Sequence, residues 1–94
     1  MRAAKVDRNQ PEIVRALRQI GASVQHLHKV GEGCPDLIAG FRGVNYLIEV
    51  KDGAAPPSQT KLTPDQAVWH QTWEGRVYVA YSVTDALRIV GAIP

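Results

Sequence analysis

The chain has 94 residues, a formal net charge of +2 and a single cysteine, Cys34. This length allows one domain with a modest core, and one cysteine excludes an internal disulfide and fits a reducing, intracellular (cytoplasmic) compartment. The small positive charge permits a nucleic-acid partner without requiring one, and with neither a membrane-length apolar run nor a signal-peptide core we expect no membrane segment.

The first half of the chain predicts a helix, a strand and a hairpin. Asn9-Gln10-Pro11 is typical of a helix start, and Gly21 of its end. Residues 23–28 alternate between apolar and polar side chains and predict a strand. Two apolar runs, 37–41 and 44–48, flank Arg42-Gly43 and predict a β-hairpin.

The second half predicts a loop, a helix, a strand and a short last helix. Residues 52–62 contain Gly and two prolines without an apolar period, and we interpret them as a loop and a candidate substrate flap. Thr63-Pro64-Asp65-Gln66 predicts the second helix, 77–81 the last strand and 84–90 a terminal helix. A right-handed crossover makes the last strand parallel to the second hairpin strand. The prediction is an α/β fold with an αβββαβ core, in which helices flank a mixed sheet in one domain, residues 1–94.

The strand pairing expected for this hairpin brings two carboxylates together. If Arg42 and Gly43 are the two turn residues, Asp36 faces Glu49, and Lys51 shares the face of Glu49. A turn shifted by one residue would place the carboxylates on opposite faces.

The repulsion between facing carboxylates favours a bound cation. Facing Cβ atoms lie roughly 4.5–5.5 Å apart, and two ionised carboxylates at about 5 Å repel by roughly 3 kcal/mol at an effective dielectric near 20. A divalent cation offsets both charges, and Mg²⁺ accepts carboxylate oxygens with water and phosphate. The alternative is a surface salt-bridge cluster. We therefore predict a Mg²⁺ or Mn²⁺ site with an ammonium beside it.

Two motifs carry a family resemblance. The stretch Gly33-Cys34-Pro35-Asp36, the tripeptide Glu49-Val50-Lys51 and the helix start 62–66 occur in this element order. They resemble the PD-(D/E)XK nuclease superfamily and, within it, the small VRR-NUC (virus-type replication-repair nuclease) domain, which is found stand-alone in phages. The resemblance covers nearly the whole chain. It implies a restriction-endonuclease-like fold and a Mg²⁺- or Mn²⁺-dependent endonuclease that hydrolyses DNA.

The resemblance also implies roles for individual residues. Asp36 and Glu49 would ligate the metal, with the Val50 carbonyl as a further ligand. Lys51 would orient or stabilise the attacking hydroxide, and its action as a base or as an electrostatic clamp stays open.

Two further residues have both a functional and a structural interpretation. Glu12 would be the acidic residue of the first helix, although an acidic side chain in a first turn also favours the helix dipole. Gln66 would be the late glutamine of the family, although it also fits a capping box with Thr63. Both roles of Gln66 could coexist at one helix end.

The substrate prediction rests on size. A lone domain of this length has little surface for reading base sequence, so we expect specificity for branched or four-way junction DNA. Resemblance to small junction-resolving nucleases adds a homodimer. A catalytically silent nucleic-acid-binding module and a phosphoesterase for small nucleotides are the alternatives.

Trp69 and Trp73 favour core or dimer contact over base stacking. The N-terminal third is basic, which fits a solvated face or phosphate contact, through Arg2, Lys5, Arg8, Arg15 and Arg18.

Overall fold

The structure is a computed structural model that describes residues 6–94, so Arg2 and Lys5 lie outside the described residues. Its elements, in chain order, are α1 (Gln10–Gln19), β1 (Ser23–His26), β2 (Leu37–Phe41), β3 (Val44–Val50), α2 (Pro57–Thr60), α3 (Pro64–Thr72), β4 (Val77–Ala80) and α4 (Val83–Ile89). This order confirms the predicted αβββαβ core with a last helix, and adds the short helix α2 within the predicted loop.

The four strands form one mixed sheet in the order β1-β2-β3-β4. The first three strands are antiparallel, and β4 runs parallel to β3, as the crossover rule predicts. Phe41 pairs with Val44 across the two-residue turn. Arg42 and Gly43 have φ angles of 52° and 81°, which is the left-handed conformation that the tight turns of twisted hairpins require. The predicted hairpin register is therefore confirmed.

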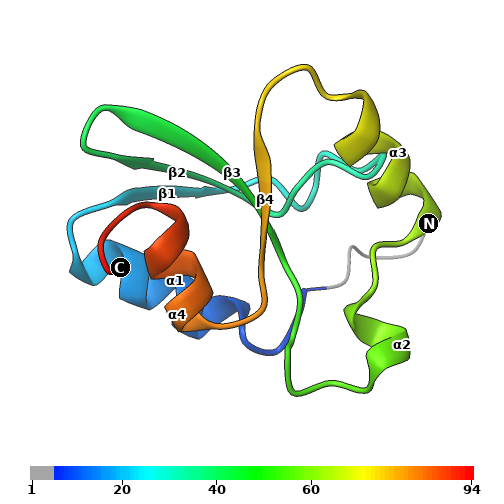
Figure 1. The fold of residues 1–94 in the computed structure, drawn as a ribbon, viewed down its shortest axis with the longest axis horizontal. Helices are drawn as coiled ribbons and strands as arrows, with labels where there is room; N and C mark the ends of the chain where they lie inside the picture. The colour runs from blue at the N-terminus through cyan, green and yellow to red at the C-terminus, as the bar shows by residue number, and fades with distance from the viewer. Residues whose placement is uncertain (1–5) are drawn as a thin grey trace.

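Helices α1 and α4 lie together on one face of the sheet (Figure 1). The hydrophobic core fills the space between them and that face. It consists of Ile13, Val14, Leu17, Ala22, Leu37, Ala39, Ile48, Val50, Ala80, Ala86 and Val90. Because side chains alternate along β3, the residues between these core positions, including Glu49, point to the opposite face.

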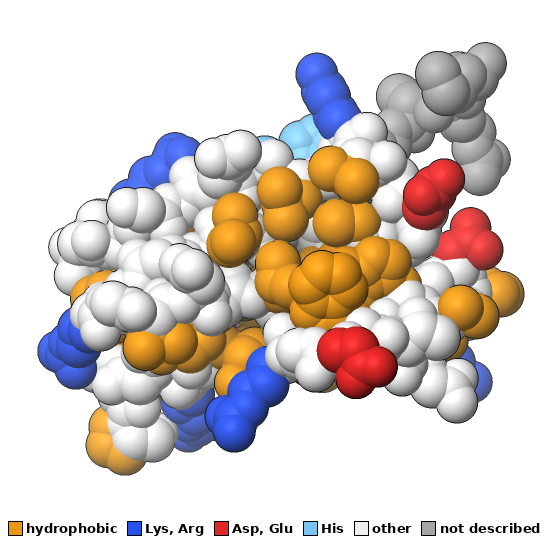
Figure 2. All heavy atoms as spheres, turned by 90° about the horizontal axis from the view of Figure 1, so that it is seen from above, with side chains coloured by type: hydrophobic (Ala, Val, Ile, Leu, Met, Phe, Trp, Pro, Cys, Tyr) orange, Lys and Arg blue, Asp and Glu red, His pale blue; other side chains and the backbone are white. Residues whose placement is uncertain are grey.

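The opposite face is covered only in part. Helix α3 lies at the end of it that carries Glu49, whereas four aliphatic side chains of the sheet remain half-buried: Ile38, Leu47, Val77 and Val79. Seen from above, hydrophobic side chains gather in a patch near the middle of the molecule (Figure 2). We call the four half-buried residues Ile38, Leu47, Val77 and Val79 the bare sheet face.

Strand β1 is shorter than predicted, ending at His26 instead of His28. The Leu27 amide still donates to the Asp36 carbonyl at 2.7 Å, but the Val30 amide then donates to the Leu27 carbonyl and turns the chain. The alternation at Leu27 and His28 therefore falls in a turn. Among the described residues, no helix has the length and apolar character needed to cross a membrane.

Candidate active site

Asp36 and Glu49 lie side by side where the β2–β3 pairing ends. Asp36 directly precedes β2, so it continues the register in which Leu37 faces Ile48. Its Oδ2 atom accepts a hydrogen bond of 2.8 Å from the Val50 amide, which fixes the carboxylate beside β3. Both side chains are buried, with 8% of Asp36 and 1% of Glu49 exposed. The hairpin thus places two acidic groups in contact away from bulk water.

The surroundings of Glu49 disfavour the charged form of its carboxyl group. Burial, then a hydrogen bond with Asp36 and the negative charge of Asp36, raise its pKa to about 9, although Lys51 acts in the opposite direction. A hydrogen bond between two carboxyl groups exists only when one of them keeps a proton. In addition, Glu49 Oε1 is buried without a hydrogen-bond donor. A divalent cation would supply the missing partner for this oxygen and relieve the repulsion, so the two residues fit the predicted metal ligands.

Lys51 lies on the same face as Glu49, as the strand alternation predicts. Its Nζ is 3.9 Å from Glu49 Oε2 and donates to Gln66 Oε1 at 2.8 Å. The Gln66 amide nitrogen donates in turn to Glu49 Oε2 at 3.1 Å. One amide therefore bridges the ammonium and the carboxylate and fixes their relative position.

Gln66 also caps α3. Its side-chain Oε1 accepts from the Thr63 backbone amide at 2.9 Å, and the Gln66 backbone amide donates to Thr63 Oγ1 at 3.3 Å, which completes a capping box. The loop before β2 supports this helix end, because a Cβ on Gly33 would lie 2.3 Å from the Asp65 carbonyl oxygen. The cap and the site contact coexist in the one side chain.

A cavity of about 270 Å³ opens beside this cluster. It is lined by Asp7, Asp36, Glu49, Lys51, Ser58, Gln59, Lys61, Thr63 and Gln66. A second cavity, of about 590 Å³, lies along α1 and reaches β1; it contains none of the acidic residues. The smaller cavity therefore gives solvent and substrate access to the buried carboxylates.

Comparison with known proteins agrees with this geometry. No protein-family model matches the sequence, and a search of curated proteins finds no significant match. A solved structure described as a VRR_NUC domain is 26% identical, with a TM-score of 0.65, and the match covers 88% of this chain and 90% of that chain. This structural match supports the assignment of the chain as a VRR-NUC-type domain. The mixed four-stranded sheet with its flanking helices is the VRR-NUC fold, and it is a nuclease-type domain.

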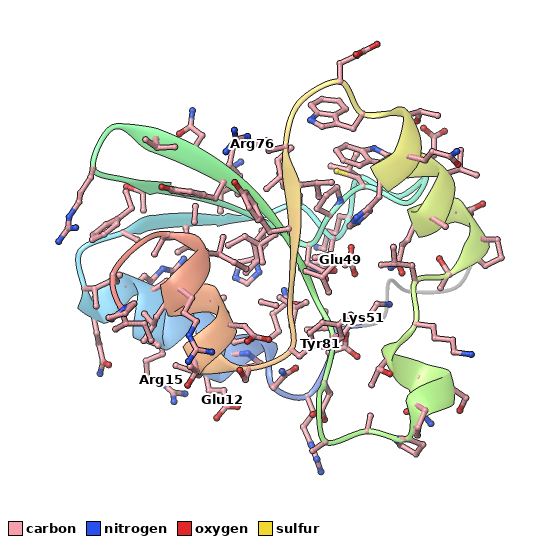
Figure 3. All side chains as sticks on the ribbon, in the orientation of Figure 1. Glu12, Arg15, Glu49, Lys51, Arg76 and Tyr81 are labelled. Carbon is pink, nitrogen blue, oxygen red and sulfur yellow. The ribbon has the colours of Figure 1, made fainter. Side chains whose placement is uncertain are left out.

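Within this VRR-NUC domain, Glu12 does not join the cluster. Its side chain is exposed on the outer side of α1, and it points away from Glu49 and Lys51 (Figure 3). The acidic residue that reaches the cavity from the N-terminal region is Asp7, three residues before α1. Its negative charge contributes to the raised pKa of Glu49.

Asn9 holds this N-terminal segment against the sheet. Its amide nitrogen donates to the Lys51 carbonyl at 3.1 Å and to the Tyr81 carbonyl at 3.3 Å. Across residues 6–94, no three His, Cys, Asp or Glu side chains are grouped closely enough to hold one metal ion. The negative charge of Asp7 acts on Glu49, and Asp36 and Glu49 stay the predicted carboxylate donors of the metal site.

Cys34 and the pair Trp69–Trp73 are three further residues that the sequence singled out. Burial, then the charges of Glu49 and Asp36, raise the pKa of the Cys34 thiol, which opposes its use as a nucleophile. Trp69 and Trp73 stack on each other with ring centroids 4.5 Å apart. Trp69 is half-buried and Trp73 is exposed on 47% of its surface. The pair is therefore neither part of the hydrophobic core nor a fully exposed surface on which a base could stack.

Proposed function

We propose that this VRR-NUC domain is a metal-dependent endonuclease that hydrolyses phosphodiester bonds in DNA. The observation that carries the proposal is the buried pair Asp36–Glu49 with Lys51 beside it, at a cavity open to substrate. Stability alone disfavours two adjacent buried carboxyls, since one of them must hold a proton or find a cation. The nuclease-type fold supports the same conclusion.

Mg²⁺ or Mn²⁺ is the cation that we propose for this pair, held by the carboxylates of Asp36 and Glu49 and the carbonyl of Val50. When bound, such an ion lowers the pKa of coordinated water and stabilises negative charge on phosphoryl oxygens. The oxygen-only donor set suits these hard cations and excludes a typical zinc site.

Lys51 is the residue that we propose acts on the reacting groups. Its ammonium has three donors, of which Gln66 takes one, so the others are free to contact a phosphate oxygen or the attacking water. In the hydrolysis the oxygen of water bonds to phosphorus and the bond from phosphorus to the 3′ leaving oxygen breaks. The water proton departs to solvent, or to Lys51 when its side chain is the neutral amine, and the leaving oxygen takes a proton from solvent. The products that the VRR-NUC resemblance implies are a 5′-phosphate and a 3′-hydroxyl.

Branched or four-way junction DNA is the substrate that we propose, cut by a homodimer. The small domain offers little surface for sequence reading, and the bare sheet face offers an apolar surface for a second copy. A dimer would present two sites to two strands. Sedimentation of Val77→Glu should show a shift toward monomer, whereas the control Val44→Glu, at a side chain that is 48% exposed outside the bare sheet face, should not. Wild-type protein that cleaves junctions as a monomer would refute the dimer.

Incubation with linear, flapped and four-way DNA tests the activity, with Mg²⁺, Mn²⁺ or a chelator and at stated salt. Cleavage should require the metal and favour the branched substrates. Asp36→Ala and Lys51→Ala should abolish it while leaving the thermal midpoint unchanged or raised, and Glu12→Ala should cut at the wild-type rate. DNA binding without any metal-dependent cleavage would instead indicate a silent binding module. Cleavage of small phosphodiesters but not of DNA would indicate a phosphoesterase.

A further inference from the structure

The segment between β3 and α3 forms part of the wall of the active-site cavity. It begins directly after Lys51 and ends at Thr63, and it contains the short helix α2 (Figure 1). Ser58, Gln59 and Lys61 from this segment line the same cavity as Asp36 and Glu49. Figure 3 shows Lys51 near the end of β3, facing the side on which this segment lies. The predicted flap therefore lies at the site.

The two sides of the cavity differ in charge. The sheet and the N-terminal segment supply three carboxyl groups, from Asp7, Asp36 and Glu49. The first residue of the segment, Asp52, pairs with Arg8 at 3.4 Å and does not line this cavity. Residues 53–62 contain no acidic side chain, and Lys61 is their only charged residue. Among residues 6–94 no carboxylate lies within salt-bridge distance of the Lys61 ammonium. The segment thus presents an unpaired cation and neutral donors to a cavity whose other side is acidic.

Both ends of the segment are anchored by hydrogen bonds, the first to the residue after β4 and the second to the active-site residue Gln66. At its start, the Gly53 amide donates to the Tyr81 carbonyl at 3.1 Å, and a Cβ on Gly53 would lie 2.9 Å from that oxygen. At its end, Thr63 forms the capping box with Gln66. Between these ends α2 buries no side chain. The backbone that carries Lys61 is therefore held at both ends, whereas the Lys61 side chain is exposed to solvent.

We propose that Lys61 binds a phosphate of the substrate strand and so holds the nucleic-acid backbone in the cavity, with Ser58 and Gln59 as neutral donors beside it. This inference rests on the proposed nuclease function. A phosphodiester backbone entering the site meets three carboxyl groups, and a cation on the facing segment offsets part of that repulsion.

Binding of fluorescently labelled four-way and linear DNA to the full chain, in chelator and at several salt concentrations, tests the proposal. Lys61→Ala should weaken binding about tenfold and reduce the slope of log affinity against log salt by about one. Lys61→Arg should restore both. Arg88→Ala removes an equal charge from an exposed position of α4, which lies with α1 on the face of the sheet opposite Glu49, and should leave both unchanged. In cleavage assays Lys61→Ala should raise KM and change kcat by less than about threefold.

The outcomes separate this inference from the proposed function. If the wild-type protein cleaves DNA but Lys61→Ala binds like wild type, or Arg88→Ala loses as much affinity, the assignment of Lys61 is wrong and the nuclease stands. A loss of kcat at unchanged affinity also overturns it. If the wild-type protein binds DNA without cleaving it, the nuclease fails, and the affinity and salt slope still decide the role of Lys61. A wild-type protein that does not bind DNA refutes both.

Discussion

Gln66 accepts a hydrogen bond from Lys51 at 2.8 Å, so the side chain that caps α3 also positions the amine of the candidate active site. Helix capping and site geometry are therefore coupled. Any change that loosens the first turn of α3 should also move Lys51 relative to Glu49, because Gln66 contacts both.

Gln66→Ala should lower both stability and cleavage. Loss of the capping box should cost about 1 kcal/mol in the free energy of unfolding, and loss of the bridge should slow cleavage by at least roughly tenfold, since Lys51 is no longer oriented. Ser82→Ala is the matched control, because Ser82 caps α4 through the Asp85 amide at 3.1 Å and lines no part of the cavity. Denaturant unfolding and cleavage rates of the two variants check this. Equal cleavage by both would contradict the bridging role.

The stability of the metal-free protein should fall as pH rises through the neutral range. The folded protein keeps a proton on Glu49 up to about pH 9, whereas the unfolded chain releases it near the ordinary value of 4.5. Between these values the native state binds more protons, so unfolding becomes easier at higher pH. Thermal midpoints between about pH 5 and 9 in chelator measure this effect.

A cation at the site should flatten that dependence, because it favours the ionised carboxyl. Glu49→Gln should flatten it as well, without metal, whereas Glu12→Gln should keep the wild-type slope. A metal-free wild-type protein whose midpoint rises steadily over this range would show that Glu49 does not hold the proton.

Asp7, not Glu12, should influence the reaction. Asp7 lines the active-site cavity, and Glu12 is exposed on the far side of α1. Asp7→Asn should therefore change the cleavage rate or the metal concentration needed for half-maximal cleavage, and Glu12→Gln should change neither. Metal titrations of the cleavage rate for both variants decide the matter, and the reverse result would restore Glu12 to the site.

Cys34 should report whether the carboxylate pair holds a cation. Its thiol pKa is raised by burial and, beyond that, by the charges of Glu49 and Asp36. A bound divalent cation offsets those charges, so the thiolate fraction should rise. Alkylation by iodoacetamide at about pH 8 should then become several-fold faster on addition of Mg²⁺, as measured by mass spectrometry. In Asp36→Asn this response should be lost; a wild-type rate that ignores Mg²⁺ would argue against a cation near the thiol.

The hairpin could be predicted from sequence because its information is local. The Arg42-Gly43 turn sets the pairing, and strand alternation then fixes the face on which Glu49 and Lys51 lie. The capping box of Gln66 is local too, since it spans four residues. These patterns need no knowledge of distant contacts, and they placed most of the cluster.

The N-terminal acidic residue could not be placed in the same way. Asp7 reaches the cavity because Asn9 donates to the carbonyls of Lys51 and Tyr81, contacts that span 42 and 72 positions in the chain. One local signal did argue against Glu12: the buried stripe of α1 runs through Ile13 and Leu17, and helical geometry turns Glu12 away from it. The end of β1 at His26 comes from a turn in which the Val30 amide donates to the Leu27 carbonyl, and the alternation of residues 23–28 does not reveal that turn.

Because Asp36 and Glu49 belong to one β-hairpin, they meet early in folding. An isolated hairpin closes in about 1–10 μs, whereas the parallel β3–β4 pairing must wait for a long crossover. The chain therefore meets its least favourable charge contact before most of its stabilising contacts have formed. A divalent cation that binds this pair, as proposed, should therefore speed folding by offsetting the repulsion between the two carboxylates. Stopped-flow refolding should accelerate in Mg²⁺, and an unchanged rate would place the formation of this hairpin after the rate-limiting step.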